Sequence, residues 1–191
     1  MLSVIVASHE SERALVSTLT ALVPGAAAGL VTEVIVADAG SRDATAEVAE
    51  IAGCRFISSG ESIGVRLKAA AQISRSPWLL FLRAGVVPQS GWIDAADRFM
   101  QATNLVDGLT RAAVFRPPGV ADYLRPTYSE LIALLRAALG SGPRADQGLL
   151  IARCFYDAIG GHSPNSDAET ALLRRIGRRR KVMLGVPVSI R

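Results

Sequence analysis

Short apolar runs alternate with segments of helical periodicity in the first half of the chain. The runs are rich in β-branched residues and predict strands that are buried on both faces. They cover Leu2–Ala7, Val34–Ala37, Cys54–Ile57 and Trp78–Leu82. Helices are predicted between these strands, after Ser11 and up to Pro24, from Asp43 to Ile51, and from Ile63 onward. The alternation favours the α/β class, with a mostly parallel central sheet and helices on both faces.

The second half of the chain is less regular. Its apolar runs predict strands at Ala112–Phe115 and Leu149–Ala152. Helices are predicted at Tyr123–Leu139, Phe155–Ile159 and Ala168–Ile176. Because no repeat and no low-complexity linker divides the chain, we expect a single domain over residues 1–191.

The composition narrows the class of protein. Of the 191 residues, 50% are hydrophobic and 20% are charged, which is sufficient for one buried core and excludes a disordered chain. No apolar run reaches the roughly 18 residues that a membrane-spanning helix needs, and the first residues lack the basic start of a signal peptide. We therefore expect a soluble protein of the cytoplasm.

The cysteines and histidines form no metal-ligand pattern. Cys54 and Cys154 have neither metal-ligand spacing nor the density of a disulfide framework, and both are expected to be small core residues in a reducing compartment. His9 and His162 likewise share no metal spacing, and we expect them in loops or lining a pocket.

The chain carries a small excess of positive charge. The formal net charge is +4, which is compatible with an anionic ligand. Aromatic residues make up only 5% of the chain, which argues against a nucleic-acid partner because base stacking needs them. Two interpretations are open for the arginine-rich run Arg174–Lys181: peripheral contact with an anionic membrane surface, or cations favoured at a helix C-terminus.

Polar residues follow three of the predicted strands. Ser8–Glu10, Asp38–Ser41 and Arg83–Val86 each come directly after an apolar run. In open α/β sheets, ligands bind outside the carboxyl ends of the strands. These three segments are therefore the candidate site.

Five segments resemble glycosyltransferase family 2, and in particular its small bacterial members that lack membrane helices. They are SVIVASHE ending at Glu10, EVIVADAGSRDAT ending at Thr45, PWLLFLRAG ending at Gly85, ADQGLLIAR ending at Arg153 and AIGGH ending at His162. The resemblance implies a GT-A fold, a nucleotide-diphosphate sugar donor, an acceptor hydroxyl and inverting transfer. It also implies a nucleotide-binding half over residues 1–100 and an acceptor half over residues 101–191.

The resemblance fails at the metal motif. Where the family carries an acidic motif for a divalent cation such as Mg²⁺ or Mn²⁺, this chain has Arg83, Ala84 and Gly85, so no metal ligand is assigned. A guanidinium of Arg83, helped by Arg66 or Lys68, is an alternative partner for the charge that develops on the leaving diphosphate. The other interpretation is a decayed site in which Arg83 is an exposed surface residue.

The resemblance also implies residues that contact the nucleotide. Asp38 stands where the family contacts the base, and Ser8, Glu10 and Gly40 belong to the same two loops. The alternative for Asp38 and Ser8 is a local structural role, because short polar side chains commonly cap turns and helices. Asp43, in the same motif, is expected to cap the following helix.

Inverting transfer requires a base for the acceptor proton, and a carboxylate is the usual choice. The resemblance puts Glu169 at the catalytic position, with Asp167 beside it, and makes Asp146 an acceptor-pocket candidate. For Glu169, charge complementarity with a helix N-terminus is an equal alternative. The sequence leaves two functions open: a family 2 glycosyltransferase, or a catalytically degenerate relative that binds a nucleotide or a partner. A nucleotidyltransferase is disfavoured because Ser8–Arg13 is no Gly-rich, Lys-containing phosphate loop.

Overall fold

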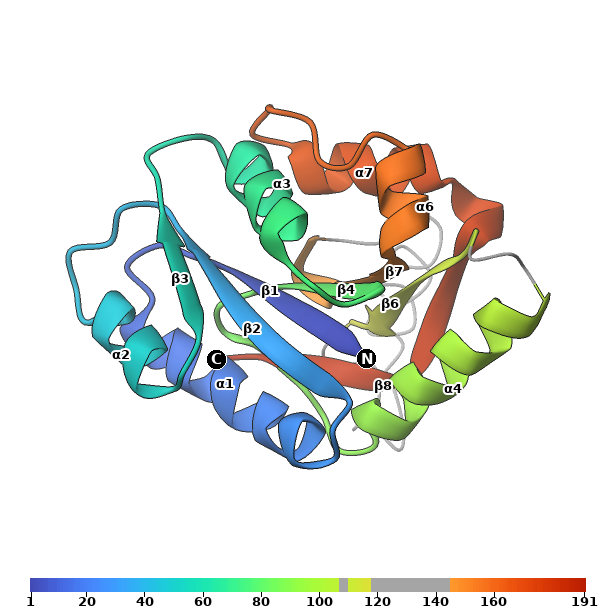
Figure 1. Ribbon diagram of the computed structural model, residues 1–191, viewed down its shortest axis with the longest axis horizontal. Helices are drawn as coiled ribbons and strands as arrows, with labels where there is room; N and C mark the ends of the chain where they lie inside the picture. Colours follow the sequence, from blue (N-terminus) through green and yellow to red (C-terminus); the bar gives the residue numbers. More distant parts are fainter. Residues whose placement is uncertain (107–109, 118–144) are drawn as a thin grey trace, which may run out of the picture.

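The computed structural model describes residues 1–106, 110–117 and 145–191 (Figure 1). The strands in these segments form one sheet with the order β3-β2-β1-β4-β7-β6-β8-β5. Their bounds are β1 Leu2–Ser8, β2 Val31–Asp38, β3 Arg55–Ser58, β4 Trp78–Arg83, β5 Val86–Pro88, β6 Ala112–Arg116, β7 Leu149–Ala152 and β8 Lys181–Ile190. The sheet continues through both halves of the sequence, as the expected single domain requires.

Helices cover both faces of the sheet. Figure 1 shows α3, α6 and α7 on one side and α1, α2 and α4 on the other. Their bounds are α1 Glu12–Ala27, α2 Thr45–Ile51, α3 Ile63–Ile73, α4 Trp92–Val106, α6 Arg153–Ala158 and α7 Ala168–Ile176, with 3₁₀ turns η1 at Ala145–Gln147 and η2 at Arg178–Arg180. The predicted α/β class is confirmed. Every residue of β1 is buried, as its unbroken apolar run indicates.

The direction of the strands determines which segments reach the ligand-binding end of the sheet. Strands β3, β2, β1 and β4 are parallel, whereas β7 is antiparallel to β4 and to β6. Phe81 in β4 pairs with Leu149 in β7, so the residues that precede β7 lie beside the carboxyl end of β4. Asp146 therefore comes to the same end of the sheet as Ser8, Asp38 and Arg83.

Each of the first two helices has one boundary that differs from the prediction, and the helix predicted at Phe155–Ile159 is observed at Arg153–Ala158. The first helix continues beyond Pro24 to Ala27. A proline removes only its own N–H, and here the carbonyl of Pro24 still accepts a hydrogen bond from Ala28 N–H at 3.0 Å. The second helix begins at Thr45 and not at Asp43. The carboxylate of Asp43 accepts a hydrogen bond from Thr45 N–H at 3.1 Å in the turn before the helix, but the N-cap of α2 is Ala44 and has no side-chain capping bond, so the expected capping role of Asp43 is wrong.

Sequence reasoning missed β5, α4 and β8. Strand β8 contains Gly185 and Pro187, which disfavour a strand, and only part of it faces the core. The sheet supplies what the pattern lacks, because β8 pairs with β6 and with β5. The predicted helix Tyr123–Leu139 lies outside the described residues.

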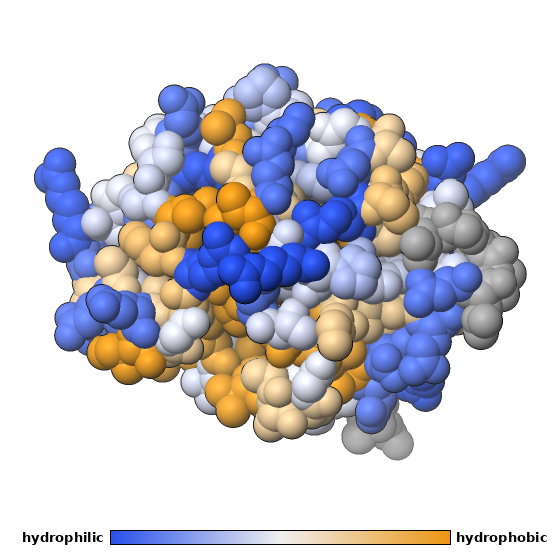
Figure 2. All heavy atoms as spheres, in the orientation of Figure 1, coloured by the Kyte–Doolittle hydropathy of each residue, from blue (hydrophilic) through white to orange (hydrophobic). Residues whose placement is uncertain are grey.

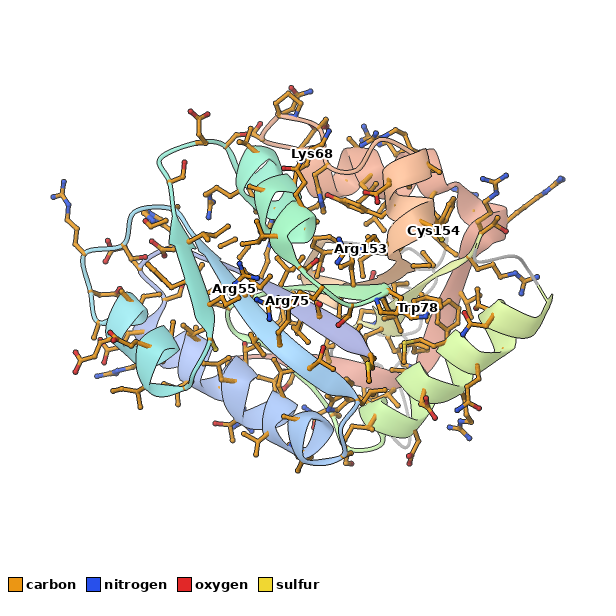
Figure 3. All side chains as sticks on the ribbon, viewed as in Figure 1. Arg55, Lys68, Arg75, Trp78, Arg153 and Cys154 are labelled. Carbon is orange, nitrogen blue, oxygen red and sulfur yellow. The ribbon has the colours of Figure 1, made fainter. Side chains whose placement is uncertain are left out.

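The cysteines lie in different environments. Cys54 is half-buried, and burial raises the pKa of its thiol to about 11. Cys154 is exposed on α6, so its expected place in the core is wrong (Figure 3). In the described part of the chain, no helix has both the length and the apolar character needed to cross a membrane.

Candidate active site at the carboxyl ends of the strands

Strand register brings the predicted loop residues together. Ser8 pairs with Asp38 across β1 and β2, and Asp38 pairs with Ser58 across β2 and β3. Side chains on paired residues of neighbouring strands point to the same face of a sheet. Ser8, Asp38 and Ser58 consequently form a polar row at the end of an otherwise apolar sheet. Ser58 was missed by sequence reasoning, and its place at the end of a strand was the only signal.

Asp38 organises the loop that follows β2. Its two carboxylate oxygens accept five hydrogen bonds, from the hydroxyls of Ser8, Ser41 and Ser58 and from the N–H groups of Gly40 and Ser41. Asp38 is only 1% exposed. Burial alone would raise the pKa of this carboxyl, but the bonds from Ser41, Ser8 and Gly40 outweigh burial and hold the pKa below its usual value. The structural role of Asp38 is thus established, and its direct contact with a nucleobase stays a prediction.

The loops after β1 and β2 are tied to each other. Glu10 N–H donates to the Ser41 hydroxyl at 2.8 Å, and the Glu10 carboxylate accepts from Arg42 N–H at 2.9 Å. Glu12 N–H donates to Asp43 at 3.0 Å. Glu10 itself has a positive φ of 47° and an exposed side chain. These contacts hold the two loops as one preformed unit beside the sheet.

Arg66 lies beneath this unit. Its guanidinium donates to the carbonyl oxygens of Ala37 at 2.5 Å and Ser8 at 3.3 Å, at the ends of β2 and β1. The residue is 8% exposed. Burial lowers the pKa of Arg66, while the negative charges of Asp38 and Glu169 act in the opposite direction. Arg66 therefore supplies fixed positive charge under both loops.

Arg83 and Glu169 form an ion pair. Arg83 Nε donates to both carboxylate oxygens of Glu169, at 3.2 and 3.0 Å, and Nη2 donates to Oε2. The fork geometry is that of a strong arginine–carboxylate pair. The hydrogen bonding of Arg83 to Glu169 is the main reason that the pKa of Arg83 is raised above its ordinary value. Arg83 was predicted to bind the diphosphate and Glu169 to accept the proton of the acceptor. In the structure, these two side chains bind each other.

A close approach between α3 and the segment before α7 places Glu169. A Cβ on Gly64 would lie 1.8 Å from the Ser163 carbonyl oxygen, so only glycine allows this contact. The Ser62 hydroxyl, at the start of α3, donates to the Pro164 carbonyl at 2.7 Å. Glu169 follows in the first turn of α7, where a carboxylate is also favoured by the helix dipole.

Asp146 reaches the same region from the segment before β7. Its Oδ1 is buried and has no hydrogen-bond partner among the residues that the structure describes. Its negative charge contributes to the raised pKa of Arg83, after the hydrogen bond from Glu169, the opposing effect of burial and the charge of Glu169. A buried carboxylate oxygen without a partner is costly in a folded protein and is a common feature of reactive sites. Asp146 is therefore the carboxylate of this cluster with free acceptor capacity.

The described residues do not fit a divalent cation at the motif position. Gly85 has φ +92°, and a Cβ there would lie 2.5 Å from the Arg191 carbonyl oxygen. Gly85 is also held from both sides, since its N–H meets α1 and its carbonyl accepts Arg191 N–H at 2.9 Å. A carboxylate cannot be attached at this position without moving the backbone. Within the described segments, no group of three or more His, Cys, Asp or Glu residues could hold a metal ion.

Three of the predicted sites lie apart from the group formed by Arg83, Glu169 and Asp146. Lys68 Nζ donates to the Gly160 carbonyl at 3.3 Å, after the end of α6 (Figure 3). Asp167 has an exposed carboxylate, 4.0 Å from Arg174. The run Arg174–Lys181 is not one helix end, because α7 stops at Ile176 and β8 begins at Lys181. Its membrane contact stays a prediction.

His162 belongs to the core. It is 2% exposed, its ring packs edge-on against Phe81, and its Nδ1 lies 2.9 Å from the Tyr156 hydroxyl. That hydroxyl also accepts His162 N–H at 3.1 Å, so it can donate to a neutral imidazole. Burial, with a smaller effect of Arg175, lowers the pKa of His162 to about 3. The residue lies in a loop, which is one of the two expected placements, and its ring is buried in the core.

A cavity opens next to the cluster, between β3 and α3. It measures about 210 Å³ and is lined by Ile57, Ser59, Val65, Arg66, Ala69 and Ile73. Figure 2 shows apolar side chains bordered by hydrophilic ones over this part of the surface. Its lining is mainly apolar with a few polar groups, but it is smaller than the roughly 300–1,000 Å³ of typical small-molecule sites. Arg66 connects the cavity to the loops that carry Ser8 and Asp38.

Comparisons with known proteins agree with this architecture. The model of a family described as "Glycosyl transferase family 2" matches residues 3–131. Glucosyl-3-phosphoglycerate synthase from Mycobacterium tuberculosis, in complex with Mn²⁺, uridine diphosphate and glucosyl-3-phosphoglycerate, is 19% identical, with a TM-score of 0.71 over 100% of this chain and 72% of that chain. A structure described as a mycobacterial protein is 21% identical, with a TM-score of 0.68 over 100% of this chain and 67% of that chain. The search of curated proteins found no match. These likenesses show a GT-A fold.

Proposed function

The chain belongs to glycosyl transferase family 2, and from this premise we propose that it transfers a sugar from a nucleotide-diphosphate donor to an acceptor hydroxyl, with inversion at the anomeric carbon. One observation carries the proposal: a guanidinium and two carboxylates meet at the carboxyl ends of the strands. Arg83 is paired with Glu169, and the charge of Asp146 acts on the same guanidinium. Within our proposal, residues 1–100 bind the donor, and residues 101–191 supply both carboxylates.

The chemistry requires a positive charge near the leaving group. As the bond between the sugar and the diphosphate breaks, negative charge develops on the phosphate oxygen, and fixed cationic donors stabilise it. Arg83 stands at the end of β4, and its side chain is 47% exposed. A planar guanidinium can bind two phosphate oxygens at once. We propose that Arg83 takes the place of the family's divalent cation, because Gly85 offers no ligand and has no room for one.

Thermal unfolding with a panel of nucleoside diphosphates tests the donor site. We expect one of UDP, GDP, ADP and dTDP to stabilise the protein by about 2.7 kcal/mol at a hundredfold excess over its Kd. This stabilisation should persist in EDTA. Arg83→Gln should weaken binding roughly tenfold, since a hydrogen bond to a charged group contributes about 1.5–3 kcal/mol. Arg98→Gln is the matched control, because Arg98 is exposed on α4 and donates within its own helix.

The outcome also separates arginine from metal. Stabilisation that appears only with Mg²⁺ or Mn²⁺ and is unchanged in Arg83→Gln would contradict our assignment of Arg83. Transfer is then measured as release of the nucleoside diphosphate from its sugar conjugate, with a panel of hydroxyl acceptors. Phosphoglyceric acid belongs in that panel because it is bound in a structurally similar enzyme.

A catalytically degenerate relative is the second candidate. Two observations favour it: both oxygens of Asp38 are engaged within the loop, and position 85 carries no carboxylate. Such a protein would bind a nucleotide or a partner without transferring a sugar. Stabilisation by a nucleoside diphosphate, with no release from any sugar conjugate across the acceptor panel, would support this candidate.

A further inference from the structure

The two candidate bases are in different states. Both oxygens of Glu169 accept hydrogen bonds from Arg83, whereas Oδ1 of Asp146 is buried without a partner among the described residues. A general base needs a free lone pair directed at the proton that it takes. A carboxylate held by a guanidinium fork has most of its acceptor sites engaged and its charge balanced, so it is less available for a proton while that pair persists. The structure therefore distinguishes Glu169, which the resemblance puts at the catalytic position, from Asp146, which it makes an acceptor-pocket candidate.

The ion pair also bears on donor binding. Arg83 cannot place the same fork on Glu169 and on a diphosphate. Its side chain is 47% exposed whereas that of Glu169 is 12% exposed, so the guanidinium is the partner that solvent and ligand can reach. Arg66 lies close enough to Glu169 for their charges to interact. Glu169 thus keeps a neighbouring positive charge when Arg83 leaves it.

We propose a division of roles that rests on the proposed function: Asp146 is the catalytic base, and Glu169 is a positioning residue that holds Arg83 until the donor diphosphate displaces it. Donor binding then breaks the Arg83–Glu169 pair and forms a pair between Arg83 and phosphate. In the absence of donor, the guanidinium stays at the end of β4 in a defined position. Glu169 and the donor therefore compete for the guanidinium of Arg83, and this competition weakens donor binding.

The transfer step balances with these residues. The acceptor oxygen forms its bond to the anomeric carbon, and its proton passes to Oδ1 of Asp146. The bond between the anomeric carbon and the β-phosphate oxygen breaks, and its electron pair leaves on the nucleoside diphosphate. Arg83 donates hydrogen bonds to that new charge. Glu169 exchanges no proton in this step.

Glu169→Gln gives opposite results under the two assignments. If Glu169 holds Arg83, removing its charge frees the guanidinium, and the nucleoside diphosphate that binds best in the panel should bind roughly five-fold more tightly, the equivalent of a moderate ion pair. Release from the corresponding sugar conjugate should continue. If Glu169 is the base, release should fall at least about 100-fold whether or not the Kd changes, because the ion pair with Arg83 exists under both assignments.

Two further variants complete the test by isothermal titration calorimetry and turnover. Asp146→Asn should reduce turnover at least about 100-fold while the nucleoside diphosphate binds as before; unchanged binding also reports an intact fold. The gain in affinity from Glu169→Gln should disappear when Arg83→Gln is also present, because the two residues act as a pair. Asp157→Asn, an exposed change on α6, is the matched control for Asp146→Asn.

These results separate the inference from the function on which it rests. If the unaltered protein binds no nucleoside diphosphate, the proposed function fails. If the unaltered protein binds one, but Glu169→Gln does not tighten the binding, the division of roles is overturned. An active Asp146→Asn variant overturns it as well.

Discussion

Gly85 is the position at which this chain departs most from its family, and the structure predicts what happens when a side chain is added there. Gly85→Ala introduces two costs. The backbone has φ +92°, a conformation that costs an L-residue about 1–2 kcal/mol. The new Cβ would lie 2.5 Å from the Arg191 carbonyl oxygen, and relieving such a contact in a packed region costs about 1–3 kcal/mol. We expect a total loss of about 3 kcal/mol.

Gly53→Ala separates the two costs. Gly53 has φ +70°, but nothing lies within 4 Å of its Cβ position, so only the backbone cost of about 1 kcal/mol applies. Urea unfolding of both variants gives the difference directly as a change in the midpoint at constant slope. Equal losses would refute the crowding by Arg191. Gly85→Asp should be at least as destabilised as Gly85→Ala and should gain no stabilisation from Mn²⁺.

Two other predictions concern buried charge. Because the pKa of His162 falls from 6.5 to about 3 on folding, its neutral form contributes stability above pH 6.5 that is lost as the pH falls toward 3. This loss is about 2 kcal/mol between pH 7 and pH 5. In thermal unfolding, His162→Phe should flatten this pH dependence, and His9→Gln, an exposed histidine, should leave it unchanged. Asp38→Asn should cost about 2 kcal/mol, because an amide nitrogen cannot accept the bonds of the loop. A variant that is fully stable but no longer binds a nucleoside diphosphate would instead indicate direct contact with the nucleotide.

Much of the fold could be predicted from the sequence because strand and helix patterns are local. The strand Leu149–Ala152 and the helix Ala168–Ile176 have the predicted bounds, and β1, β4 and β6 differ by one residue at one end. Strand β8 was missed since its glycine and proline hide it, and only pairing with β6 and β5 makes it a strand. The end of α1 was misjudged because the effect of Pro24 depends on bonds made by the residues that follow it.

The candidate site, like the fold, could be predicted from the sequence only in part. The order of apolar runs and polar turns predicted which loops meet, since parallel strands end on the same side of a sheet. The resemblance also left two interpretations of Arg83 open where the family has an acidic motif: a partner for the diphosphate, or a surface residue of a decayed site. The sequence could not show which side chains lack a hydrogen-bond partner, because such partners can be distant along the chain. Two of the five hydrogen bonds to Asp38 come from Ser8 and Ser58 on neighbouring strands.

The sequence by itself thus determined the α/β class, and it predicted the end of the sheet at which the polar loops meet and the candidate charged groups there. Only the tertiary structure decided that Arg83 holds Glu169, that Asp146 has an oxygen without a partner in the described segments, and that Gly85 is confined by Arg191. The physical reason is the separation along the chain over which each effect acts. Periodicity and turn chemistry act over a few residues, whereas a hydrogen-bond partner, a buried charge or a steric limit is set by whichever segment packing brings alongside.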